Sequence, residues 1–282
     1  MKFLKLSIIA FFSLFAISCK ENKSTNPNKT ETAVSKNIKT EDVVYNIRGI
    51  NYKSFAAFTT DSDQPKPVVM VIPEWWGLND YAKNRAKQLA ELGYFAMAVD
   101  FYGEGKVVDN PEEAGKLAQP FYQIPINAKM IFDAAKARVV TYPNADHSKI
   151  AVIGYCFGGA QALNMARQES DLKGAVSFHG NLMTGVKPKN NKVKILVCNG
   201  ANDTFVSPEE IVAFKKEMDS AKINYTFIDY PNSLHSFTNP ASTEVGKKFN
   251  MKIAYNKEAD EKSWNDMKKF LADIFKENNQ QT

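Results

Sequence analysis

Residues that build metal sites and disulfide frameworks are scarce in this sequence, whose 282 residues include three cysteines and three histidines. These residues lack the spacing of a zinc site, and no glycine-rich loop after a strand carries the lysine of a phosphate-binding loop. The net charge of +5 is spread along the chain without a dense basic block, which argues against a nucleic-acid-binding surface. The sequence therefore predicts no metal, no other cofactor and no nucleic-acid partner, and we expect a monomer.

The N-terminal apolar stretch is too short to be a membrane-spanning helix. It covers residues 6–17, is interrupted by two serines, and follows a short basic start at Lys2 and Lys5. A basic start followed by a short apolar run is typical of a secretory signal peptide rather than of a transmembrane segment.

The residues after this stretch resemble the lipobox of bacterial lipoproteins. Ser18 is a small residue directly before Cys19, although Ala16 stands where such boxes more often carry leucine. The resemblance implies a signal peptide over residues 1–18, lipidation of Cys19 and attachment to a bacterial membrane. Plain secretion after cleavage elsewhere is the alternative, and both place the protein outside the cytoplasm.

Two segments of different composition follow the signal peptide. Residues 19–42 are polar, contain almost no large apolar side chain and are expected to form a flexible tether. Residues 43–282 alternate apolar runs with helical patterns, which predicts an α/β fold with a mostly parallel central sheet and helices on both faces. Strands are expected over 43–47, 52–58, 67–74, 94–100, 149–156, 174–180, 193–200 and 225–231, and helices over 81–92, 111–119, 127–141, 158–169 and 258–275.

A cysteine occupies the place that serine has in a nucleophile elbow. The segment Gly154-Tyr155-Cys156-Phe157-Gly158 matches the pattern Gly-x-Ser-x-Gly, a tight turn from a strand into a helix. This turn lifts the central side chain clear of the backbone at the carboxyl end of the sheet, where ligands of such folds bind. Cys156 is therefore the predicted nucleophile.

Only three histidines are available as the base that a nucleophilic thiol needs. His147 lies in a polar turn before a strand and is expected to be solvated. His179 ends a strand at the correct edge, where a structural role is the favoured interpretation. His235 follows the last predicted strand, and the order nucleophile, acid, base in hydrolases of this fold favours it as the catalytic base.

Asp203 is the candidate acid because it ends the strand between those of the nucleophile and the base. The alternative is that Asp203 caps the helix that follows. Ser207 and the proline after it already supply a cap and a helix start, which leaves Asp203 available to orient His235.

Four motifs in this order, "VIPEWWGLN", "GYCFGG", "NGANDTFV" and "HSF", resemble the dienelactone hydrolase family of α/β hydrolases over roughly residues 40–275. The resemblance implies the α/β-hydrolase fold and a triad of Cys156, Asp203 and His235. It also implies cleavage of a small carboxylic ester or lactone through an acyl-thioester intermediate.

The resemblance further assigns roles to residues that flank the triad. It implies that Glu74 hydrogen-bonds the resting thiol until substrate displaces it. The backbone N–H groups of Trp75 and Phe157 would form the oxyanion hole.

The sequence departs from the family where dienelactone-cleaving members hold the substrate carboxylate with two arginines. Glu104 and Asn239 occupy the positions that look equivalent, and Lys106 is a weak substitute in a glycine-rich loop. A carboxylate would be repelled by Glu104 and would find no bidentate partner in Asn239. We therefore expect an uncharged substrate with an apolar or aromatic acyl group. The expected substrate-binding residues are Trp76, Tyr102, Glu104, Tyr155, Phe237 and Asn239.

Two functions of other classes remain as alternatives. One is a lipid-anchored small-molecule-binding protein without catalysis, and the other is a redox protein in which Cys156 is oxidised to a sulfenic acid. Cys198 is expected on a strand separated from that of Cys156 by one other strand, so it should be a buried apolar residue and not a disulfide partner.

Overall fold

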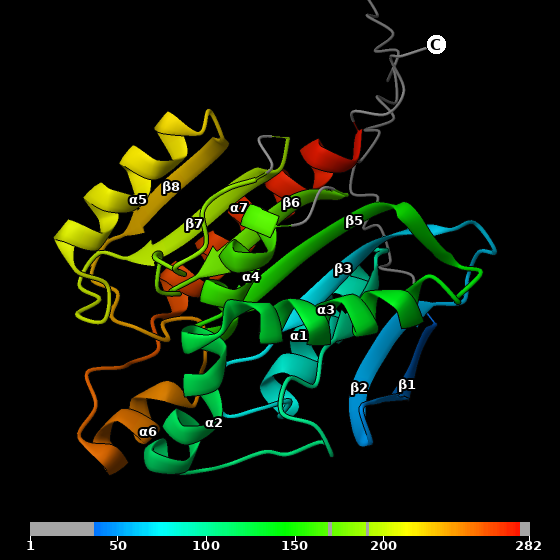
Figure 1. Cartoon of the computed structure of the whole chain (residues 1–282), viewed down its shortest axis with the longest axis horizontal. Coiled ribbons are helices and arrows are strands. Elements are labelled where there is room, and N and C mark those ends of the chain that lie inside the picture. The colour runs from blue at the N-terminus through cyan, green and yellow to red at the C-terminus, as the bar shows by residue number, and fades with distance from the viewer. Residues whose placement is uncertain (1–36, 169–170, 190–191, 277–282) are drawn as a thin grey trace, which may run out of the picture. The chain divides into compact units, whose positions relative to one another are not determined.

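One eight-stranded sheet forms the centre of the computed structural model, which describes residues 37–168, 171–189 and 192–276. The strand order is β1-β2-β4-β3-β5-β6-β7-β8 (Figure 1). The pairs β1–β2 and β2–β4 are antiparallel, and the other neighbours are parallel. The strands are β1 (Ile38–Ile47), β2 (Ile50–Thr59), β3 (Lys66–Ile72), β4 (Phe95–Ala98), β5 (Ala145–Tyr155), β6 (Leu172–Phe178), β7 (Lys194–Gly200) and β8 (Asn224–Tyr230).

Helices cover both faces of this sheet. Buried side chains of α1 and α7 form a core with one face, and those of α3, α4 and α5 form a core with the other. The helices are α1 (Asp80–Glu91), α2 (Pro111–Gln123), α3 (Pro125–Val139), α4 (Phe157–Gln168), α5 (Pro208–Ser220), α6 (Ser242–Phe249) and α7 (Lys257–Lys276). The predicted α/β-hydrolase architecture is confirmed.

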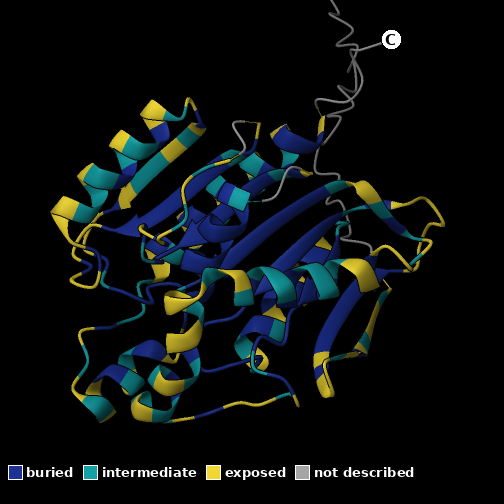
Figure 2. Cartoon of the chain, viewed as in Figure 1, coloured by how far each residue is buried: buried dark blue, intermediate teal, exposed yellow. Residues whose placement is uncertain are grey.

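The central strands are buried on both faces because neighbouring residues along each strand point in opposite directions. On β3, Val69 and Val71 belong to the α1/α7 core, while Val68, Met70 and Ile72 belong to the core with α3, α4 and α5. Figure 2 shows the buried centre of the sheet and the exposed outer faces of α2 and α5. The continuous apolar runs that predicted these strands reflect this two-sided burial.

The folded domain begins earlier than expected. β1 starts at Ile38, which pairs with Thr59 of β2, so residues 38–42 belong to the sheet and not to a tether. Polar residues are tolerated there because β1 is an edge strand and half of its side chains face solvent. The predicted signal peptide over residues 1–18 and the predicted lipidation site Cys19 lie outside the described residues.

One helix was missed from the sequence. Helix α6 follows the loop after β8 and has only eight residues, one of them a glycine, so the segment is too short for its periodicity to identify a helix. Within the described ranges no helix has both the length and the apolar character to cross a membrane.

Candidate active site

The nucleophile elbow joins β5 to α4, and Cys156 at its tip has a left-handed φ of 55°. The flanking glycines are required because the turn is tightly packed. A Cβ atom on Gly154 would lie 1.9 Å from the carbonyl oxygen of Gly158, and one on Gly158 would lie 2.2 Å from that of Ile72. The strain at Cys156 is thus maintained by packing around it, as expected at a functional turn.

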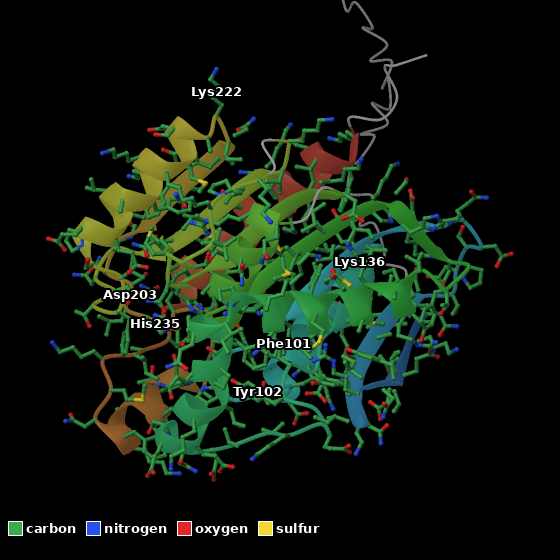
Figure 3. All side chains as sticks on the ribbon, viewed as in Figure 1. Phe101, Tyr102, Lys136, Asp203, Lys222 and His235 are labelled. Atoms are coloured by element: carbon green, nitrogen blue, oxygen red, sulfur yellow. The ribbon has the colours of Figure 1, made fainter. Side chains whose placement is uncertain are left out.

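Asp203 and His235 meet at the same edge of the sheet. Asp203 follows β7, His235 follows β8, and Nδ1 of His235 lies 2.8 Å from Oδ2 of Asp203. The other carboxylate oxygen of Asp203 accepts a 2.8 Å hydrogen bond from the backbone N–H of Phe205. Both side chains are buried, and Figure 3 shows them side by side. Asp203 is therefore held in place to orient the imidazole.

The pKa of His235 is raised to about 10. Burial alone would lower it, but the interactions of the imidazole with Cys156 and with the Asp203 carboxylate outweigh burial. The direction of this shift favours the protonated imidazole, whose proton can be given to a leaving group.

Glu74 contacts the loop that carries His235. Its Oε1 accepts a 2.9 Å hydrogen bond from Ser236 Oγ, and its Oε2 accepts a 2.6 Å hydrogen bond from Asn239 Nδ2. Burial raises the pKa of Glu74, and these two donors oppose the rise. In the described structure neither oxygen has Cys156 as a hydrogen-bond partner, so Glu74 differs from the thiol-bound carboxylate that the resemblance implied.

Trp75 and Phe157 are the two residues whose N–H groups the resemblance assigns to the oxyanion hole. Both line the same pocket as Cys156. Phe157 is the first residue of α4, and the N–H groups of a first helical turn have no acceptor within their own helix. The oxyanion hole formed by the N–H groups of Trp75 and Phe157 stays a prediction.

A cavity of about 210 Å³ opens at Cys156 and is predominantly apolar. No lysine, arginine, aspartate or glutamate contributes to the described wall of this pocket. The lining residues are Trp75, Ala118, Tyr122, Cys156, Phe157, Asn181, Phe205, His235, Ser236, Met251 and Ile253.

Comparisons with known proteins identify the family of this chain. The model of the dienelactone hydrolase family matches residues 55–275. The chain belongs to the dienelactone hydrolase family. Protein usf of Aquifex pyrophilus is 31% identical over 185 residues, which cover 64% of this chain and 80% of that protein. A putative carboxymethylenebutenolidase of Aquifex aeolicus (strain VF5) is 30% identical over 189 residues, with the same two shares.

Solved structures of the family share the fold. A dienelactone hydrolase-like promiscuous phosphotriesterase from metagenomic libraries has a TM-score of 0.77 and 31% identity, covering 84% of this chain and 99% of that chain. The structure named m3DLH has a TM-score of 0.79 and 30% identity, with 84% and 98% coverage. The chain is therefore an α/β hydrolase of this family.

The four aromatic residues expected to bind substrate do not line the pocket at Cys156. Tyr155 and Phe237 are buried in the core, because the first ends β5 pointing away from the thiol side and the second packs on Tyr230. Tyr102 donates a 2.9 Å hydrogen bond to the Trp75 carbonyl and supports the pocket wall from behind. Trp76 lines a separate hollow. Proximity to a motif in sequence did not place these side chains on the cleft.

Glu104 and Asn239, which stand at the two expected arginine positions, also lie outside the pocket wall. Glu104 is exposed, forms an ion pair with Lys53 and accepts a hydrogen bond from the backbone of Asn51. Asn239 is directed at Glu74. Lys106 pairs with Glu113 at 2.9 Å and likewise does not contribute to the pocket. Repulsion of substrate by Glu104 is therefore not supported.

Several pocket residues were missed from the sequence. Tyr122 comes from the end of α2, Asn181 follows β6, and Met251 and Ile253 follow α6. None belongs to a motif. Phe205 could have been identified from the sequence, since it lies two residues after Asp203 within "NDTFV". The centroid of its ring lies 4.8 Å from that of His235.

The second cysteine of the described ranges is structural. Cys198 lies on β7, two positions from β5 in the sheet, and is buried and free. Burial raises its pKa to about 12. Within the part of the chain that the structure describes, no group of three or more histidine, cysteine or acidic side chains could hold a metal ion.

Proposed function

We propose that this hydrolase cleaves a small, uncharged carboxylic ester or lactone with Cys156 as nucleophile. The observation that carries the proposal is that Cys156 and His235 line one pocket, while Asp203 contacts the far nitrogen of His235 at 2.8 Å and orients the imidazole. Thiolate is a strong nucleophile toward activated acyl groups, so a thiolate paired with imidazolium suits ester chemistry.

In the proposed acylation step, Cys156 Sγ attacks the carbonyl carbon and a C–S bond forms. The carbonyl oxygen takes the negative charge and is stabilised by the N–H groups of Trp75 and Phe157. The C–O bond to the leaving group then breaks, and His235 gives its proton to the leaving oxygen. The product is an acyl-thioester on Cys156.

In the proposed deacylation step, water attacks the thioester carbon while His235 takes a proton from that water. The C–S bond breaks, the acid is released and the thiolate–imidazolium pair returns. Asp203 holds the imidazole orientation in both steps, and Glu74 fixes the loop on which His235 lies.

The apolar pocket supports an uncharged substrate. A substrate carboxylate would lose hydration there without meeting a cationic side chain of the described pocket wall, which is costly. The volume of about 210 Å³ favours a compact acyl group over a long chain inside the cavity.

The experiment is hydrolysis of p-nitrophenyl acetate with and without iodoacetamide, together with Cys156→Ala. We expect the alkylated protein and Cys156→Ala to lose activity while the melting temperature stays nearly unchanged, and mass spectrometry to detect an acyl adduct on Cys156. Cys156→Ser should retain little activity, because a hydroxyl needs a stronger base. Undiminished activity of Cys156→Ala would exclude the proposal.

The same experiment separates the two alternatives. Ligand binding without Cys156-dependent turnover would indicate a non-catalytic binding protein. Oxidation of Cys156 to a sulfenic acid that a second protein thiol then resolves would indicate a redox role, although Cys198 is two strands away in the sheet.

A second candidate activity is hydrolysis of an uncharged phosphotriester. It is favoured by the uncharged pocket and by the 31% identity to a protein named a promiscuous phosphotriesterase. Turnover of paraoxon that disappears in Cys156→Ala would support it.

We also propose that the protein is an extracytoplasmic monomer anchored to a bacterial membrane through a lipid on Cys19. The basic start, short apolar run and small residue before Cys19 support the anchor. Light scattering of the chain without residues 1–19 tests the monomer.

A further inference from the structure

His179 lies between the nucleophile and the histidine that activates it. The backbone N–H of Cys156 donates a 3.1 Å hydrogen bond to Nδ1 of His179, in addition to a 3.0 Å bond to the Phe178 carbonyl. The ring of His179 packs edge-on against that of His235, with centroids 5.3 Å apart. His179 is buried and has a left-handed φ of 41°, so its ring is fixed by its surroundings.

These contacts determine the tautomer of His179. A backbone N–H can only donate, so Nδ1 must carry the lone pair and the ring proton must be on Nε2. Nε2 lies 2.7 Å from Oγ1 of Thr238, which is the acceptor for that proton. Burial lowers the pKa of His179 well below its ordinary value, and the charges of His235 and Arg85 lower it further. The imidazole is therefore neutral.

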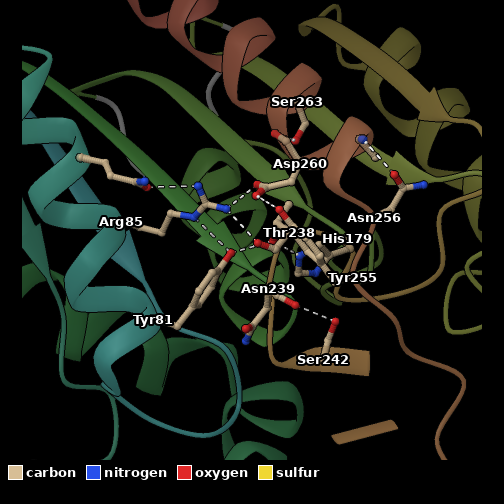
Figure 4. Close-up of polar contacts among 12 residues, drawn as sticks. Tyr81, Arg85, His179, Thr238, Asn239, Ser242, Tyr255, Asn256, Asp260 and Ser263 are labelled. Carbon is tan, nitrogen blue, oxygen red and sulfur yellow. Dashed lines mark hydrogen bonds and ion pairs between the residues drawn. The ribbon is translucent and has the colours of Figure 1, made fainter. Parts of the chain in front are cut away.

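Thr238 connects this imidazole to α1 and to the loop of His235. Its Oγ1 lies 2.7 Å from the Tyr81 hydroxyl, and its carbonyl accepts a 2.8 Å hydrogen bond from Arg85. Arg85 is itself buried and forms an ion pair with Asp260 of α7 (Figure 4). Because Thr238 is three residues after His235, the network fixes the same loop that carries the catalytic base.

We propose that His179 is a positioning residue that joins the backbone of Cys156 to the His235 loop through its neutral Nε2–H tautomer. The inference rests on the proposed function, since it concerns the alignment of Cys156 with His235. It adds a residue that neither touches substrate nor belongs to the triad. Its loss should reduce kcat and change KM little, because the pocket wall is left intact.

The test is His179→Phe, which keeps a planar ring and removes both nitrogens. We expect kcat for p-nitrophenyl acetate to fall about tenfold or more. A tenfold fall corresponds to ~1.4 kcal/mol, which is the size of the hydrogen bond lost between the Cys156 backbone N–H and the ring. The pH dependence of Cys156 alkylation by iodoacetamide should shift as well. The pH profile of alkylation reports the interactions among the titratable and polar groups that face the His179 imidazole. These groups belong to Cys156, His235, Thr238, Tyr81, Arg85 and Tyr155.

Two further variants keep the test decisive. His179→Asn places an amide oxygen near the Nδ1 position and suits a positive φ, so it should recover much of the lost kcat. Thr238→Val removes the acceptor of the Nε2 proton and should shift the alkylation profile even if His179→Phe does not fold. Tyr45→Phe, which deletes a buried hydroxyl bonded to Ser54 in the β1–β2 hairpin, should leave both measurements unchanged.

A kcat of His179→Phe within about twofold of wild type, or an unshifted alkylation profile in Thr238→Val, would overturn the inference. Failure of the proposed function is distinguishable from this result. It would appear as hydrolysis that survives Cys156→Ala, whereas the alkylation rate of Cys156 is measurable without any ester substrate.

Discussion

Asn239 donates a 2.6 Å hydrogen bond to Oε2 of Glu74, and both side chains are buried. The Asn239 amide supplies a hydrogen-bond donor to the buried Glu74 carboxylate without placing a positive charge beside it. The Ser236 hydroxyl donates a hydrogen bond to the other carboxylate oxygen of Glu74. Glu74 therefore holds both ends of the segment from Ser236 to Asn239 in place. The carboxylate acts on the loop beside His235 rather than on a cation.

Asn239→Leu should destabilise the protein by about 1–3 kcal/mol, because one oxygen of a buried carboxylate is left without its donor. Chemical denaturation measures this loss. The kcat should fall with it, since the loop of His235 loses one of two attachments to Glu74. As a matched control, Asn84→Leu on the exposed face of α1 should change neither quantity, and equal stability of the two variants would contradict this role of Glu74.

An uncharged lactone should have a kcat/KM about ten- to a hundredfold higher than its analogue with a free carboxylate. This ratio corresponds to the free energy of the charge-assisted hydrogen bond that the carboxylate does not find in the pocket. The check is a methyl-ester-capped substrate against its free acid. Salt should change the ratio little, because the cost is desolvation in the pocket and Glu104 lies outside it.

Met251→Lys, at the pocket wall, should narrow this gap by supplying a cation. Lys106→Gln should leave it unchanged, because Lys106 pairs with Glu113. A free acid that is the better substrate of the wild-type protein would refute the uncharged-substrate interpretation.

Activity toward alkyl esters should fall as the pH rises through about 10, the pKa of His235. Because the pKa of His235 is raised, the imidazole keeps its proton up to that pH. The leaving alkoxide needs this proton, so the rate falls when the imidazole loses it. Rates are measured after subtraction of the Cys156→Ala background. Asp203→Asn should move the fall to lower pH, because the charge and hydrogen bond of Asp203 help to raise the pKa, and an unmoved profile would contradict this assignment.

Cells grown with radioactive palmitate should yield a labelled, membrane-associated protein, and Cys19→Ala should release it into the soluble fraction. Covalent attachment of acyl chains gives stable membrane binding when two or more are present. Recovery of unlabelled wild-type protein wholly in the soluble fraction would reject the lipobox.

The parts of the fold that the sequence predicts well are those with two-sided burial. Residues 68–72 of β3 and 150–155 of β5 form continuous buried runs because helices cover both faces of the sheet, and the order of the strands along the chain placed Cys156, Asp203 and His235 at one edge. The polar start of β1 was missed because pairing with β2, rather than apolar burial, keeps it in the sheet.

The pocket wall could not be predicted in the same way. Tyr122, Asn181 and Met251 come from three separate segments that become neighbours only through the fold. The tautomer of His179 likewise depends on the backbone N–H of Cys156, 23 residues earlier in the chain, and no local pattern encodes that contact.

Helix α4, which begins directly after Cys156, is buried from Phe157 to Arg167, and residues 150–155 of β5 before it are buried as well. Segments without solvent-exposed backbone open only when the whole domain unfolds, so the amides of α4 should be among the slowest to exchange with deuterium. Cys156 therefore keeps its strained conformation for as long as the domain is folded, and heat should inactivate and unfold the protein at one temperature.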